Sequence, residues 1–358
     1  MKKKFTPEAN LAQSKALMHF GVRYVLVTII LYGLLEWLPS VFVEPVNIYT
    51  ATMVGCILKG LGMAPTVQGA FISLNGFSVK VIGECTALFL VVLFSAFVLA
   101  YPARWKDKAV GLLFGTGVLV AANNCRLVLI FMAGLKYPRL FEYVHIYFGQ
   151  LIMVVLVFLA SVIWLRTIVS VKTTDTPTDF FLRFVAFSSI PFLLWINLNN
   201  GYIAMNQHMI RFLFSLLGHG LPMPGGHNFF YATFNLIAFA ALILATKSME
   251  RRRKTKVLFM GLCALYATHV VLNICVVLLS VYHIRQAFII GNATNIVSQY
   301  IVPFLFWVWA VRRDLFQGKG MVARPFVGRI RYAFYSMSTL SVDRSPSKTR
   351  RQVCCWER

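Results

Sequence analysis

Charged residues are scarce in this sequence. Only 13% of its 358 residues are charged, whereas soluble domains carry about 25%. Among the charged residues the acidic ones are the minority, with 12 Asp and Glu against 35 Lys and Arg. The mean hydropathy is +0.70. This composition excludes an ordinary soluble domain and predicts a protein embedded in a lipid bilayer. A net charge of +23 also occurs in nucleic-acid-binding proteins. In a membrane protein it is typical of cytoplasmic loops, so we expect no nucleic-acid partner.

Paired cysteines and cofactor motifs are also missing. The seven cysteines show no CxxC and no secretory spacing, which argues against a disulfide framework or a zinc ribbon. The sequence contains no Walker, dinucleotide-binding or HExxH motif. His219, His227, His269 and His283 lie toward the outer side of the second half, but their spacing matches no known metal site. We therefore expect neither a metal nor a cofactor.

Long apolar runs are what the sequence has in abundance. Eight of them are long enough to cross about 30 Å of hydrocarbon, and each is continuous rather than alternating, which predicts helices. They lie near 20–38, 86–102, 109–134, 146–165, 180–198, 229–246, 257–281 and 296–311. The first run follows a basic N-terminus, and no small-residue cleavage site comes after the run. We therefore expect this run to stay in the protein as an uncleaved membrane anchor. The sequence thus predicts an all-α integral membrane protein with about eight transmembrane helices.

The distribution of Lys and Arg predicts the orientation of these helices. Most of the 35 lie at the N-terminus, in the loops 103–108, 166–183 and 247–256, and in the tail from residue 312. Such a bias places both termini in the cytoplasm. We divide the chain into a basic N-terminus (1–19), a first four-helix half (20–170), a second half (171–312) and a basic cytoplasmic tail (313–358).

The second half has features of a degenerate repeat of the first. ILKGLGM (57–63) is similar to LFSLLGH (213–219), and a shift of 148 residues matches spans two to four with spans six to eight. The shift aligns three polar residues with neutral ones: Cys85 with Thr233, Arg126 with Ile274 and His145 with Ala293. Any chemistry that depends on these polar residues therefore belongs to the first half.

Three polar residues are predicted to meet near the outer leaflet. Cys85 lies at the outer start of the second span, Arg126 in the outer half of the third and His145 at the outer start of the fourth. An intramembrane Arg costs roughly 2.5–3.5 kcal/mol on insertion scales and usually marks function. Two alternatives remain open, a structural Arg126 paired with Glu84 or Glu142, and a Cys85 that is merely a buried apolar residue. The joint placement of the three favours a site.

The segment before Cys85 predicts a small extracytoplasmic β-hairpin. Residues 70–82 alternate apolar and polar side chains around Asn75-Gly76, the strongest short-range hairpin pattern. The hairpin would deliver the chain into a helix that Cys85 opens. Helix N-termini and nearby cations both favour thiolates, so Cys85 is a candidate nucleophile.

Three motifs resemble those of the exosortase and archaeosortase family. GECTAL (83–88), NNCR (123–126) and HIYFG (145–149) are similar, in this order, to its cysteine, Asn-x-x-Arg and histidine motifs. The resemblance covers about residues 20–170, and Ala87 departs from it where the family usually has glycine. It implies a membrane cysteine transpeptidase.

The resemblance also implies roles and partners. Cys85 would be the nucleophile, His145 the general acid and base, and Arg126 the stabiliser of the thiolate or oxyanion. Asn123 would orient the site, and Glu84 and Thr86 are weaker candidates. The expected partners are membrane-anchored proteins whose C-terminus carries a short motif such as Pro-Glu-Pro, a transmembrane helix and an Arg-rich end. They would be cleaved on the periplasmic face, where the active site is expected to open.

Two other functions agree with parts of the sequence. The number of spans and the internal repeat are compatible with a multi-pass transporter or flippase, although the polar residues lie in one half only. A relative that binds sorting signals without cleaving them is the second alternative. Transport that is unaffected by loss of the Cys85 thiol favours the former, and an unreactive Cys85 favours the latter.

Overall fold

The computed structural model describes residues 7–37, 40–169, 176–216, 218, 231–247 and 249–316. All of them belong to one compact unit. The expected basic tail beyond Phe316 lies outside the described residues, as do His219 and His227.

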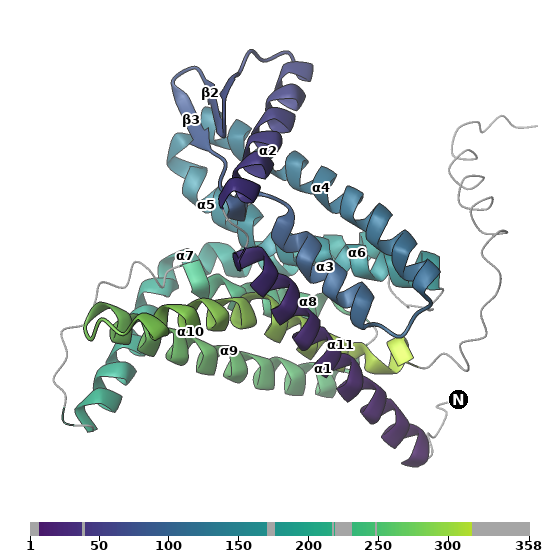
Figure 1. Cartoon of the computed structure of the whole chain (residues 1–358). Coiled ribbons are helices and arrows are strands. Elements are labelled where there is room, and N and C mark those ends of the chain that lie inside the picture. Colours follow the sequence, from purple (N-terminus) through teal and green to yellow (C-terminus); the bar gives the residue numbers. More distant parts are fainter. Residues whose placement is uncertain are drawn as a thin grey trace, which may run out of the picture. The chain divides into compact units, whose positions relative to one another are not determined.

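The first half contains both helices and a small sheet (Figure 1). In chain order its elements are α1 (Pro7–Trp37), α2 (Ser40–Gly60), β1 (Thr66–Gln68), β2 (Phe71–Leu74), β3 (Phe77–Lys80), the 3-10 turn η1 (Gly83–Cys85), α3 (Leu88–Ala100), α4 (Trp105–Lys136), the 3-10 turn η2 (Pro138–Leu140), α5 (Phe141–Ile146), the π-helix η3 (Tyr147–Ile152), α6 (Met153–Trp164) and the π-helix η4 (Leu165–Val169).

The second half is helical throughout its described residues. Its elements are α7 (Pro177–Leu216), the 3-10 turn η6 (Tyr231–Phe234), α8 (Asn235–Ala245), α9 (Arg251–Ser280), α10 (Arg285–Ile296), the π-helix η7 (Val297–Ile301) and α11 (Val302–Phe316).

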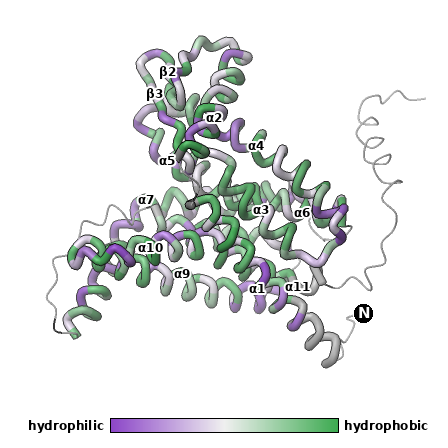
Figure 2. The backbone as a smooth tube through the Cα atoms, in the orientation of Figure 1, coloured by the Kyte–Doolittle hydropathy of each residue, from purple (hydrophilic) through white to green (hydrophobic). Residues whose placement is uncertain are grey.

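The helical membrane fold expected from the sequence is confirmed. In the described chain, seven helical stretches are long and apolar enough to cross a bilayer. They are Leu17–Leu35, Val41–Gly60, Trp105–Lys136, Pro138–Val169, Pro177–Leu216, Arg251–Ser280 and Arg285–Val311. Two shorter apolar helices, Leu88–Ala100 and Ala232–Ala245, account for the remaining expected runs. Figure 2 shows the hydrophobic residues along these helices. The helix α2 was not among the eight expected spans.

The predicted hairpin is confirmed and has a third strand. β2 pairs antiparallel with β3 across the Asn75-Gly76 turn, and β1 pairs with the other edge of β2. Both turn residues have positive φ, 50° and 80°, because the turns that match the twist of a hairpin require that conformation. The hydroxyls of Ser73 and Ser78 hydrogen-bond across the strands at 2.8 Å.

The sheet packs on α2 and on the C-terminal part of α4. One apolar cluster joins α2, the sheet and α4, and its buried members are Ala51, Val54, Leu58, Ile72, Val81, Leu127, Val128 and Phe131. Open strand edges have no stable place in hydrocarbon, because no water is there to bond their free N–H and C=O groups. The sheet and the parts of α2 and α4 that cover it therefore belong at the membrane surface.

The length of α4 agrees with this placement. Its 32 residues span about 48 Å at 1.5 Å per residue, well beyond the ~30 Å of hydrocarbon. Arg126 directly precedes Leu127, Val128 and Phe131, the residues of α4 that pack under the sheet.

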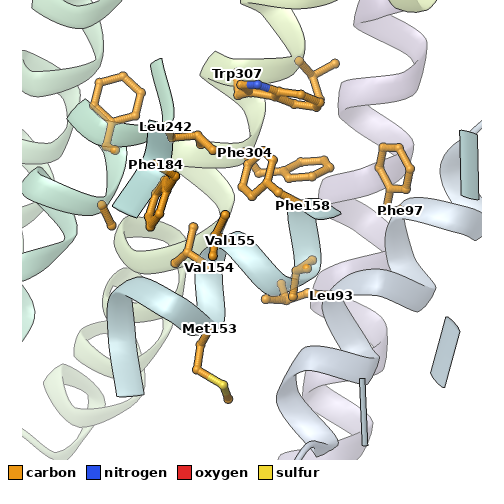
Figure 3. Packing of buried hydrophobic residues seen from close by; sticks show 14 of the residues in the cluster. Leu93, Phe97, Met153, Val154, Val155, Phe158, Phe184, Leu242, Phe304 and Trp307 are labelled. Carbon is orange, nitrogen blue, oxygen red and sulfur yellow. The ribbon is translucent and has the colours of Figure 1, made fainter. Parts of the chain in front are cut away.

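Both halves contribute to one hydrophobic core. Phe158 of α6 packs against Phe304 and Trp307 of α11, with ring centroids 5.0 and 4.9 Å apart (Figure 3). Phe97 of α3 and Tyr24 of α1 contact the same Phe304 at 5.2 and 4.7 Å. The two halves expected from the sequence are thus joined by interlocking aromatic side chains.

The second half repeats the element order of the first. Each has a 3-10 turn, a short apolar helix, a long helix, another short helix, a π-helix and a closing helix. One close contact is also repeated. Gly115 of α4 lies directly against the ring of Phe94, and Gly261 of α9 lies in the same way against Phe239. Packing between the halves is reciprocal, because α1 packs on α11 while α7 packs on α6. The internal duplication itself stays a prediction of the sequence.

Candidate active site

Cys85 ends the turn η1 and lies just before α3. The side chain of Cys85 is half-buried and packs against the apolar cluster beneath the sheet. The helix begins only at Leu88, so the expectation that Cys85 opens the helix is wrong by a few residues. The buried Thr86 connects the turn to the helix, because its Oγ1 donates to the Gly83 carbonyl at 2.6 Å and accepts the Leu88 N–H at 3.4 Å.

Asn123 and Arg126 both bind the backbone carbonyl of Cys85. Asn123 Nδ2 donates to this oxygen at 3.0 Å and Arg126 Nη2 donates to it at 3.2 Å. The two residues are three positions apart on α4 and therefore share one helix face. Both are almost fully buried, with 1% and 4% of their surface exposed. The motif NNCR thus converges on the cysteine, although through its main chain rather than its thiol.

Part of this polar surface is left without a hydrogen bond. Arg126 Nε and Asn123 Oδ1 are buried and have no hydrogen-bond partner among the described residues. Arg126 also has no ion-pair partner in the described chain, so the alternative of a structural pair with Glu84 or Glu142 is not observed. A buried charge without a partner is unfavourable. The guanidinium lies within electrostatic range of Cys85.

His145 belongs to the same neighbourhood and is held by aromatic rings. It lies on α5, half-buried, and interacts electrostatically with Arg126 and with Glu142. Its ring stacks on Phe141 at 5.8 Å, and Phe141 contacts Phe77 of β3 at 5.4 Å. The hairpin therefore helps to orient the imidazole. Among the described residues, the side chains that hydrogen-bond Cys85 are those of Asn123 and Arg126 rather than His145, and catalytic contacts are often longer before substrate binds.

Tyr300 is a neighbour of the site that the sequence analysis missed. It lies on η7 in the second half, and its ring contacts Phe89 in the first turn of α3 at 4.3 Å. It interacts electrostatically with Arg126 and with the exposed Glu84. Nothing in the sequence near Tyr300 resembles the motifs of the first half. Only the packing of the two halves brings it here.

The described residues contain no cluster of three or more His, Cys, Asp or Glu side chains that could hold a metal ion. His269 is buried in the second half, where its Nδ1 hydrogen-bonds the Tyr202 hydroxyl at 2.7 Å. That histidine is part of a helix contact.

Comparison with known proteins gives one match. A family model described as "Transmembrane exosortase (Exosortase_EpsH)" matches residues 12–162. No curated protein and no solved structure matches the chain. The matched segment contains η1, α4 and α5, and so all of the side chains that gather around Cys85 except that of Tyr300. The segment 12–162 of this membrane protein belongs to the transmembrane exosortase family.

Proposed function

We propose that this protein is a membrane cysteine transpeptidase or peptidase of the exosortase type. It cleaves a C-terminal sorting signal from exported proteins through a thioester on Cys85, at the periplasmic face of the inner membrane. The observation that supports this most is the convergence of Asn123 and Arg126 on the turn that presents Cys85.

The site residues have coherent chemical roles in this reaction. The Cys85 thiolate attacks the carbonyl carbon of the scissile peptide bond, and the negative charge moves to the carbonyl oxygen. Arg126 supplies a fixed positive charge in a poorly solvated site, where such charge stabilises an oxyanion most. When the C–N bond breaks, protonated His145 gives its proton to the leaving amine and a thioester remains.

The second step reverses the proton transfer. Neutral His145 takes a proton from an acceptor amine, hydroxyl or water, and the acceptor attacks the thioester carbonyl. This attack gives a tetrahedral intermediate. Its collapse breaks the C–S bond, leaves the acyl group bonded to the acceptor and releases the Cys85 thiolate. Asn123 and Arg126 hold the Cys85 carbonyl throughout, so the sulfur keeps its position between the steps.

The placement of the charges supports the proposed orientation. The basic loops favour cytoplasmic termini, and the sheet that covers the site belongs at a membrane surface. A substrate anchored by its own helix would present its cleavage motif at this level, close to Arg126.

The decisive experiment replaces Cys85 by Ala, in cells that express a reporter protein ending in a short motif, an apolar helix and an Arg cluster. We expect the reporter to stay unprocessed in membranes while the protein itself accumulates normally, as followed by the reporter's gel mobility. Cys125→Ala is the matched control, because this exposed cysteine lies beside Arg126 and is expected to leave processing unchanged. Normal maturation with Cys85→Ala overturns the proposal.

The internal repeat favours one alternative function, a transporter, because repeats are common in that class. A transport activity that persists with Cys85→Ala supports it. A protein that only binds sorting signals is distinguished by a thiol-reactive probe near neutral pH, with which its Cys85 stays unreactive.

A further inference from the structure

The second half contains a cavity between α9 and α10. Its volume is about 230 Å³, smaller than the roughly 300–1,000 Å³ of most sites for small molecules. Its lining residues come from η6, α9, α10 and η7: Ala232, Leu272, Cys275, Val276, Leu279, Ala287, Phe288, Gly291, Asn292, Asn295 and Gln299. A cavity of this size suits a short stretch of chain rather than a complete cofactor.

The cavity lies where the repeat places the counterpart of the candidate active site. In the first half, that site is built from the 3-10 turn η1, the long helix α4 and the short helix α5. The corresponding elements of the second half are η6, α9 and α10, and these elements line the cavity. The second half therefore has an open site at the corresponding elements, and its lining includes the Cys275 thiol but no guanidinium and no imidazole.

The two walls of the cavity differ in chemistry. Asn292, Asn295 and Gln299 lie on the α10–η7 side, and Gln299 Nε2 donates to Asn295 Oδ1 at 2.9 Å. Leu272, Val276 and Leu279 of α9 form an aliphatic wall. Apart from the Cys275 thiol, the lining has no ionisable group.

This lining selects for an uncharged ligand with both donors and acceptors. Side-chain amides offer N–H donors and C=O acceptors together, which is also what a peptide bond requires. A phosphate or an Arg-rich segment would be left unpaired there. An acyl chain uses none of the amides, and a lipid ester offers acceptors alone. Peptide is the class that satisfies both walls.

We propose that this cavity is a non-catalytic docking site for an uncharged peptide segment of the membrane-anchored substrate. This inference rests on the proposed function, since it takes the sorted protein as the ligand. Binding there would position the substrate while its cleavage motif reaches Cys85 in the other half.

Photo-crosslinking tests the occupant directly. Phe288 lines the cavity and is 57% exposed, whereas the adjacent Ile289 is 71% exposed and does not line it. Each is replaced in turn by p-benzoylphenylalanine in the full chain carrying Cys85→Ala, so that bound reporter is not consumed. We expect position 288 to crosslink the reporter's C-terminal segment, identified by mass spectrometry, and position 289 to crosslink it at least severalfold less.

A substitution tests the amide wall. The double variant Asn292→Leu/Asn295→Leu, with Cys85 intact, is expected to slow reporter maturation about tenfold at low reporter levels, as the loss of two hydrogen bonds predicts. The rate of Cys85 labelling by a thiol probe should not change, which shows that the first half remains folded. Ile289→Leu is the control. Crosslinks to phospholipid alone, equal crosslinks at both positions, or unchanged maturation overturn the docking site.

The two proposals fail in different ways. If the reporter matures with Cys85→Ala, the proposed function fails, and the crosslink at position 288 still decides whether the cavity binds the peptide. If maturation requires Cys85 but position 288 captures no reporter, only the docking site is overturned.

Discussion

At the scale of single residues, Arg126 joins the backbone of Cys85 to the charge of the site. Its Nη2 is bound to the Cys85 carbonyl, while its buried Nε has no hydrogen-bond partner among the described residues. A planar guanidinium can donate hydrogen bonds on two sides at once because its N–H donors are held in a rigid, fork-shaped plane. One edge binds the turn that presents Cys85, and in the proposed reaction the rest of the group stabilises the oxyanion. The uncharged side-chain amide of Asn123 donates a second hydrogen bond to the same Cys85 carbonyl.

Replacing Arg126 by Lys separates these two contributions. Lysine keeps the charge but is a flexible point donor without the fork. We expect the rate of reporter maturation to fall by ~10²–10³, the usual loss when an oxyanion donor is removed, with normal amounts of protein in the membrane. Arg139→Lys is the control, because Arg139 is exposed on η2. A full rate with Arg126→Lys would show that charge alone suffices.

At the scale of elements, the sheet acts on the site through aromatic contacts. Phe77 of β3 contacts Phe131 of α4 and Phe141 of α5, at 5.4 Å in both cases, and Phe141 stacks on His145. The rings approach α4 closely because residue 134 is glycine. A Cβ atom there would collide with both Phe77 and Phe141.

Gly134→Ala therefore tests whether the sheet positions His145. Overpacking typically costs about 1–3 kcal/mol, so we expect a lower melting temperature in detergent and slower reporter maturation. Gly117→Ala on the same helix is the matched control, because its added methyl group meets no atom within 4 Å. In an open helix position, Ala is favoured over Gly by up to ~1 kcal/mol, so Gly117→Ala should not lower the melting temperature. Equal behaviour of the two variants would contradict the coupling.

At the scale of the whole molecule, the two halves share a core. Phe304 and Trp307 from the second half pack against Phe158 of the first. Tyr300 reaches the start of α3 through Phe89. The exosortase segment ends at residue 162, yet its inner surface is completed by helices beyond that point.

A chain that ends after residue 170 should consequently fail to accumulate in membranes. Without α7, α8 and α11 it exposes Phe158 and Phe97, which are 2% and 0% exposed in the structure. Immunoblotting of membranes measures the amount, and co-expression of the second half as a separate chain should restore it. A chain ending after Gln317 is the control and should accumulate and process the reporter. A stable, active fragment 1–170 would contradict a shared core.

Sequence patterns with local physical causes were reliable guides to this structure. Continuous apolar runs predict spanning helices because lipid cannot satisfy exposed backbone groups. Asn75-Gly76 predicts the hairpin because the turn needs positive φ at both residues. The motifs around Cys85, Asn123, Arg126 and His145 predict one neighbourhood, and the structure brings Asn123 and Arg126 to Cys85 and His145 within electrostatic range of Arg126.

Other features depend on contacts between distant segments, and no local pattern reports them. The role of α2 follows from the sheet that packs on it, and Arg126 binds a carbonyl rather than the thiol because of how α4 packs beside η1. Tyr300 reaches the site only because the two halves pack together, and the cavity forms only where α9 and α10 pack together. The sequence by itself determined the long apolar helices other than α2, the turn and the reactive residue types, since these depend on each residue and its near neighbours. Only the tertiary structure decided which atoms face one another, because side-chain packing is a property of the assembled chain.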